Sequence, residues 1–264
     1  MRRTVPILAV LAPWPGDALA GAWTQPEGEG QVIVSGSVGV APFTGFQGDV
    51  GDTGSSFTSL FFEYGMIEGL TVGGTAFVEM PSDDADPTAN AGIFLRKRLW
   101  QGEAGDVASV QVGYVQPLDD LFGDGFGGPD AHPTHELSLR ALYGRGFGGD
   151  WGSAFVSLEG GYHAQLDGAD DEIRADVTAG YAPYPCCLGM LSFYSTVPLG
   201  DMDDAAVKLA PSFAYTFNAR DPSAPEPGED ADVATPFTLQ IGVSQDLLNL
   251  DDGFGVQTSI WRPF

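Results

Sequence analysis

The chain has 264 residues, of which 43% are hydrophobic, with 37 glycines, 17 phenylalanines and a formal net charge of −25. Its many aromatic residues exclude a disordered chain, and its glycine content argues against a helical one. The acidic balance, with no basic patch, argues against nucleic acid as a partner. A single all-β domain fits the length, because sandwiches and barrels often reach this size undivided.

Residues 1–20 have the pattern of a signal peptide. Arg2 and Arg3 supply the positive charge, a short apolar core follows, and Ala18-Leu19-Ala20 provides the small residues of a cleavage site. The apolar run is interrupted by prolines and is too short to span a membrane as a helix. The sequence therefore predicts an exported protein whose single domain covers residues 21–264.

Segments that alternate between apolar and polar residues recur along the rest of the chain, as expected of strands with one apolar face. The hairpin at 56–79 shows the pattern most clearly: Phe62 lies on the apolar face and Glu63 on the polar face, which Phe57 and Phe61 interrupt. After an irregular lead-in, the twelve expected strands are 31–40, 56–66, 70–79, 91–100, 107–116, 136–144, 153–163, 172–182, 188–196, 207–217, 237–245 and 255–264.

The links between these strands alternate in length. Those after odd-numbered strands are mostly long and acidic, and those after even-numbered strands are mostly short, with 218–236 as the exception. An even number of strands of about ten residues, with links of unequal length on the two sides, matches a transmembrane barrel. We therefore predict an all-β fold, a single up-and-down antiparallel transmembrane β-barrel of about twelve strands.

A soluble β-sandwich or lipocalin-like barrel is the alternative, because the alternation alone does not tell the inside from the outside. Three features favour the membrane barrel. The polar face is rich in glycine and small residues, aromatic residues recur near strand ends as in an interfacial girdle, and the chain ends on the aromatic Phe264.

Several short stretches resemble known bacterial outer-membrane barrels. The terminal Phe264 resembles the signal that such barrels present to their assembly machinery. Residues 63–73, EYGMIEGLTVG, resemble a recurrent hairpin of the barrels described as transporters or as phenol meta-pathway-associated proteins, and residues 96–100 and 172–177 are also similar to such chains. The resemblance implies a location in the bacterial outer membrane. It also implies outer-membrane lipid and the barrel-assembly machinery as partners, and passage of a small-molecule solute, apolar or aromatic.

If the apolar faces meet lipid, the charged side chains of the polar faces line the lumen. These predicted lumen-lining residues are Glu63, Glu79, Arg96, Arg98, Arg140, Glu159, His163, Arg174, Asp176 and Lys208. Acids and bases in a narrow lumen should pair, because an unpaired charge there is costly. Two interpretations stay open: a ladder that only fills a closed structural or surface-interaction barrel, and a polar constriction that selects small solutes.

The sequence predicts no metal site and no cofactor, because the acidic loop pairs lack the spacing of a calcium loop and the three histidines are scattered. Some outer-membrane barrels are lipid-modifying enzymes. The chain has no G-x-S-x-G motif, and His163 is the only strand histidine, so we expect no enzymatic activity. The adjacent Cys186 and Cys187 exclude a disulfide framework.

Overall fold

The computed structural model describes residues 21–40, 56–80, 87–103, 105–118, 135–200, 205–219, 235–248 and 254–264. The signal peptide predicted at 1–20 lies outside these residues. So do His132 and four of the acidic loop pairs, at 83–84, 119–120, 203–204 and 251–252.

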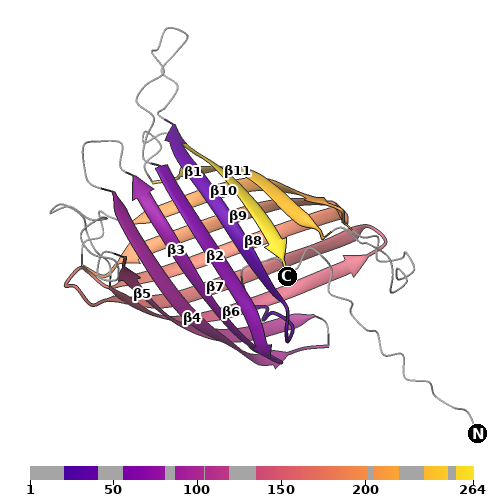
Figure 1. Cartoon of the computed structure of the whole chain (residues 1–264), viewed down its shortest axis with the longest axis horizontal. Helices are drawn as coiled ribbons and strands as arrows, with labels where there is room; N and C mark the ends of the chain where they lie inside the picture. The colour runs from indigo at the N-terminus through magenta and orange to yellow at the C-terminus, as the bar shows by residue number, and fades with distance from the viewer. Residues whose placement is uncertain are drawn as a thin grey trace, which may run out of the picture.

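Twelve strands form a closed antiparallel barrel in which each strand pairs with its neighbours in the chain and β1 closes on β12 (Figure 1). The predicted fold class is therefore confirmed. The strands are β1 (Gly30–Val40), β2 (Ser56–Ile67), β3 (Leu70–Met80), β4 (Thr88–Gln101), β5 (Asp106–Pro117), β6 (Glu136–Gly149), β7 (Gly152–Gln165), β8 (Glu172–Tyr184), β9 (Cys187–Pro198), β10 (Ala206–Phe217), β11 (Phe237–Asp246) and β12 (Phe254–Pro263). No helix in the described ranges is long and apolar enough to span a membrane.

The two ends of the barrel differ in their links. We call the end that carries the short links 68–69, 102–105, 150–151 and 185–186 the turn end, and the opposite end the loop end. The long link between β10 and β11 also lies at the turn end, so the exception predicted at 218–236 is an insertion and not a miscounted strand. Cys186 in the β8–β9 turn and Cys187 at the start of β9 form no disulfide.

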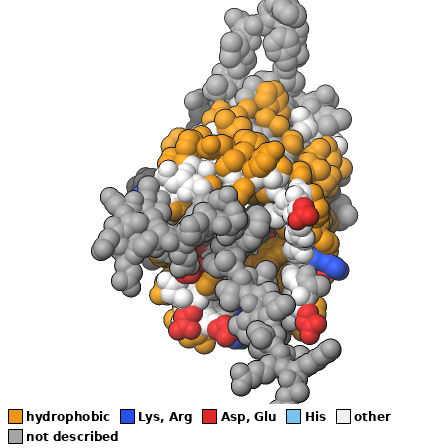
Figure 2. Space-filling view, turned by 90° about the vertical axis from the view of Figure 1, so that its right-hand side faces the viewer, with side chains coloured by type: hydrophobic (Ala, Val, Ile, Leu, Met, Phe, Trp, Pro, Cys, Tyr) orange, Lys and Arg blue, Asp and Glu red, His pale blue; other side chains and the backbone are white. Residues whose placement is uncertain are grey.

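The outer surface of the barrel is apolar. Ile93 on β4 is 67% exposed, and Leu139 on β6 and Ile241 on β11 are also exposed. Figure 2 shows hydrophobic side chains gathered over the upper part of the face in view. Soluble monomers rarely expose apolar patches of this extent, so this surface is the kind that lipid or another apolar phase covers.

The inward positions hold polar residues, glycines and a small core at the turn end. This core consists of Ala22, Val107 and Leu142, against which Trp23 packs. Ala22 and Trp23 belong to the segment that precedes β1, which we expected to be an irregular lead-in. That segment lies inside the barrel, and we call residues 21–29 the N-terminal plug.

Candidate functional site in the barrel lumen

The N-terminal plug enters the lumen across the inner face of β2. The backbone N–H of Gly28 donates to the carbonyl of Gly65 (2.9 Å), and the N–H of Gly65 donates to the carbonyl of Glu29 (2.9 Å). A Cβ at Gly65 would lie 1.9 Å from the carbonyl oxygen of Pro26. Only glycine therefore lets the plug approach β2 so closely.

Deeper in the lumen, the backbone of the plug is held by side chains from three strands. Ser109 Oγ on β5 donates to the carbonyl of Ala22 (2.5 Å), and Arg96 Nη1 on β4 donates to the carbonyl of Trp23 (2.9 Å). Thr71 Oγ1 on β3 accepts a hydrogen bond from the backbone N–H of Gln25 (2.8 Å). Plug carbonyls and amides are thus satisfied by the wall, as buried backbone groups must be.

The indole of Trp23 fixes the plug against the next part of the wall, on β6 and β7. It packs edge-on against Phe155, with 6.1 Å between ring centroids and 88° between planes. A Cβ at Gly144 on β6 would lie 2.5 Å from Trp23 Cη2. The ring therefore occupies a space that this inward-facing glycine leaves empty.

A buried charge pair lies beside the plug. Glu63 is 0% exposed, and its carboxylate accepts hydrogen bonds from Gln25 of the plug, from Gln31 Nε2 (2.6 Å) and from Arg96 Nη1 (3.2 Å). Arg96 Nε also donates to Gln111 Oε1 (3.1 Å). Each charge is therefore compensated and hydrogen-bonded, which buried ions require.

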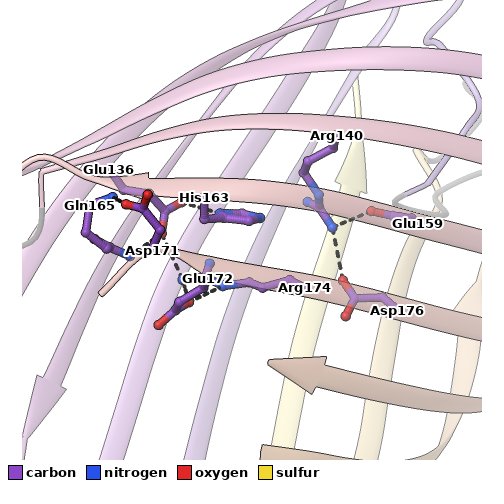
Figure 3. Close-up of polar contacts among 9 residues, drawn as sticks. All are labelled: Glu136, Arg140, Glu159, His163, Gln165, Asp171, Glu172, Arg174 and Asp176. Carbon is purple, nitrogen blue, oxygen red and sulfur yellow. Dashed lines mark hydrogen bonds and ion pairs between the residues drawn. The ribbon is translucent and has the colours of Figure 1, made fainter. Parts of the chain in front are cut away.

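A second charge cluster lies on β6, β7 and β8. Arg140 Nη2 donates to Glu159 Oε2 (2.5 Å) and to Asp176 Oδ2 (3.0 Å), so one guanidinium lies between two carboxylates (Figure 3). Glu159 and Asp176 are directly opposite each other on adjacent strands. Paired positions of this kind place side chains on the same face of the sheet.

A third cluster lies at the loop end of the same strands. Glu136 is its centre: one carboxylate oxygen lies 2.7 Å from His163 Nδ1, and the other accepts from Arg174 Nη2 (2.8 Å). Arg174 also pairs with Glu172 at 2.7 Å. Figure 3 shows these side chains converging beside the second cluster.

The structure brings seven of the ten predicted lumen residues into contact with charged partners in these three clusters. The other three stand apart from them. Arg98 pairs with Glu68 (2.9 Å) at the turn end, and Glu79 and Lys208 are exposed near the loop end.

Sequence reasoning missed two central members of the third cluster, Glu136 and Glu172. Both could have been found, because Glu136 has the same period-two parity as Arg140, and Glu172 the same parity as Arg174. In the part of the chain that the structure describes, no group of three or more His, Cys, Asp or Glu side chains is arranged to hold a metal ion.

Asp171, which precedes β8, accepts hydrogen bonds from the hydroxyl of Tyr162 and from the backbone N–H of Gln165 (2.9 Å). These bonds, chiefly that from Tyr162, lower the pKa of the Asp171 carboxyl. Tyr162→Phe is therefore expected to raise this pKa toward the ordinary value of about 4. A lowered pKa stabilises the fold above that value, and the gain disappears as the pH falls through the folded-state pKa. The variant should accordingly be less stable near neutrality and equal to the wild type in acid.

A carboxyl ¹³C NMR titration of Asp171 measures this shift directly. The control is Tyr143→Phe, because Tyr143 donates in the same way to Asp106 at the turn end (2.6 Å). An Asp171 titration curve that moves equally in both variants, or in neither, would contradict the assignment.

A different sector of the lumen wall is aromatic. Phe57 packs against Phe77 (5.6 Å between centroids), and Phe61 stacks on Phe94 (5.7 Å). The guanidinium of Arg96 lies 5.3 Å from the centre of the Phe94 ring, within the range of a cation–π contact. The phenylalanines that interrupt the polar face of the first hairpin therefore form an aromatic wall, made by β2, β3 and β4.

The lumen is not filled throughout by side chains. Tyr194 on β9 lies opposite Asp176 and therefore points inward, yet it is 42% exposed. Ser212 and Gln240, which share a hydrogen bond of 2.9 Å between β10 and β11, are also only half-buried. Open space thus lies along β9–β11, whereas the plug covers Glu63 and Arg96.

No protein-family model matches the chain, and no protein of curated function does. Among solved structures, the chain is similar to a KdgM porin, with 6% identity over 89% of this chain and 99% of the other and a TM-score of 0.53. It is also similar to the COG4313 outer membrane channel from Pseudomonas putida F1, with 16% identity over 95% and 99% of the two chains and a TM-score of 0.53. At these identities the likeness concerns the fold: the chain has the fold of these outer-membrane barrels.

Proposed function

We propose that this protein is a barrel of the bacterial outer membrane through which a small molecule passes passively. The apolar outer surface, the fold shared with outer-membrane channels and the unequal links support this proposal. Short links face the periplasm in such barrels, so the turn end with its N-terminal plug is the periplasmic end. Outer-membrane lipid is then the partner of the outer surface, and Phe264 is the residue that the assembly machinery would recognise.

One observation carries the choice of solute: the lumen has an aromatic wall and a charged wall. Phe57, Phe61, Phe77 and Phe94 line one sector, and the Arg140 cluster lines another. A small molecule with a ring at one end and a polar group at the other would find a partner on each wall. This agrees with the apolar or aromatic solute that the resemblance to phenol meta-pathway-associated barrels implies, and that finer assignment stays a prediction.

A closed barrel with a structural or surface-interaction role is the second candidate. The plug favours it, because residues 21–29 occupy the lumen at the turn end. Absence of enzymatic activity stays a prediction as well.

Solute entry into proteoliposomes tests the proposal. L-Phenylalanine and L-leucine are both zwitterions, and only the first carries an aromatic ring. We expect the wild-type barrel to admit phenylalanine faster than leucine, because ring stacking on the aromatic wall contributes about 0.5–1.5 kcal/mol per pair. The double variant Phe57→Ala, Phe61→Ala should lose this preference.

The matched control is Phe62→Ala, because Phe62 directly follows Phe61 on β2 but is exposed on the outer surface. It should keep the wild-type ratio of the two influx rates. If neither amino acid enters through the wild type or through a chain without residues 22–28, the channel proposal is wrong and the closed barrel is favoured.

A further inference from the structure

The first residue after the predicted cleavage site is buried in the lumen wall. Gly21 lies against β7: a Cβ at this position would be 2.4 Å from Ser157 Oγ and 3.5 Å from Glu159 Oε1. Only glycine fits this position without a shift of Ser157, so the start of the plug is fitted to this site.

The site contains a hydroxyl that lacks a partner. Ser157 is 2% exposed, and its Oγ has no hydrogen-bond partner among the described residues. A buried polar group without a partner is rare and destabilising. The unpartnered hydroxyl indicates that the site receives a hydrogen-bond donor or acceptor in the mature protein.

The site holds more carboxylates than cations. Among the described residues, Arg140 is the only cation in ion-pair contact with Glu159 and Asp176, so these three ionised side chains sum to one negative charge. The guanidinium binds Glu159 through Oε2, whereas Oε1 lies on the side of Gly21. One further cation beside Oε1 would neutralise the cluster.

We propose that this site binds the α-ammonium group that signal-peptide cleavage creates on Gly21. A signal peptidase hydrolyses the Ala20–Gly21 amide with one water, which leaves a carboxylate on Ala20 and an ammonium on Gly21. The ammonium pairs with Glu159 and donates to Ser157 Oγ. Before cleavage the same nitrogen is an uncharged amide, so maturation itself locks the plug into the lumen.

The proposal rests on the predicted export and not on passage of a solute, so it can fail while the proposed channel stands. Acylation of amines in the mature protein, isolated from membranes and assayed as folded barrel, tests it. N-terminal sequencing first shows whether the chain begins at Gly21; a start elsewhere overturns the proposal. Mass spectrometry of the N-terminal peptide then gives the labelling rate of the α-amine.

We expect the α-amine of the folded wild type to react about tenfold more slowly than that of the urea-unfolded chain, because a neighbouring carboxylate favours the unreactive ammonium over the free amine. Glu159→Gln keeps the shape of the site and should restore most of the lost reactivity. The matched control is Glu172→Gln, which removes a carboxylate of the third cluster, paired with Arg174 at 2.7 Å, and should leave the α-amine protected.

If Glu159→Gln does not fold, a chain with one alanine added before Gly21 takes its place in the test, because the added residue moves the α-amine out of the site. It should be labelled at nearly the unfolded rate. Equal rates for folded and unfolded wild type overturn the proposal, and so does protection that survives both changes.

Discussion

Removal of residues 22–28 is expected to raise the single-channel conductance of the barrel several-fold in a planar bilayer. These residues fill the turn end of the lumen, where Ala22 packs against Val107 and Leu142 and Arg96 holds the carbonyl of Trp23. Ions cross only where water can follow, so a lumen freed of the plug should conduct through the space already present beside Tyr194.

Trp23→Ala should also raise the single-channel conductance, by a smaller factor, because the indole anchors the plug. It empties the space beside Gly144 and should increase current fluctuations as the plug loosens. Trp151→Ala is the control, because Trp151 is exposed at the β6–β7 turn and stacks on Tyr181 outside the lumen. A conductance that stays at the wild-type level without residues 22–28 would mean that the narrowest part of the lumen lies elsewhere.

The barrel could be predicted from the sequence because its signal is local. Period-two alternation needs only neighbouring residues, and each of the twelve expected strands coincides with an observed one. Which charges pair could not be predicted, because this depends on register between strands. Arg140 meets Glu159 and Asp176 only because β6, β7 and β8 align as they do, and a shift of one residue would turn these side chains to the other face.

The plug could not be predicted because its signal is not local. Residues 21–29 show no alternation, and their glycines and proline look like those of any irregular connection. The sequence of the surrounding wall does not predict the plug either, because Gly65 and Gly144 are simply small residues on the polar faces of their strands. Their close contacts with Pro26 and Trp23 arise from the closure of the barrel, which no short stretch of sequence contains.

Glu63→Gln is expected to lower the free energy of unfolding by about 3 kcal/mol, the usual loss when one partner of a buried ion pair is removed. Arg96 is 3% exposed, and its other acceptors are the neutral Gln111 side chain and the carbonyl of Trp23. The substitution keeps the shape of the side chain but leaves this guanidinium without a charged hydrogen-bond partner. It also weakens the contacts to Gln25 and Gln31. Urea unfolding in lipid vesicles, followed by tryptophan fluorescence, measures the change.

Glu68→Gln is the matched control, since it removes the carboxylate of a second Arg–Glu pair, between the β2–β3 link and Arg98 on β4. Glu68 is 88% exposed and bonds Arg98 at 2.9 Å, a shorter distance than the 3.2 Å between Arg96 and Glu63. If the distance between the charged atoms governed the stability, Glu68→Gln would lower the free energy of unfolding more than Glu63→Gln does. Because water solvates an exposed charge, we expect Glu68→Gln to lower the free energy of unfolding only slightly. Equal losses in the two variants would mean that water reaches Arg96 despite the plug, and that the lumen is open at its turn end.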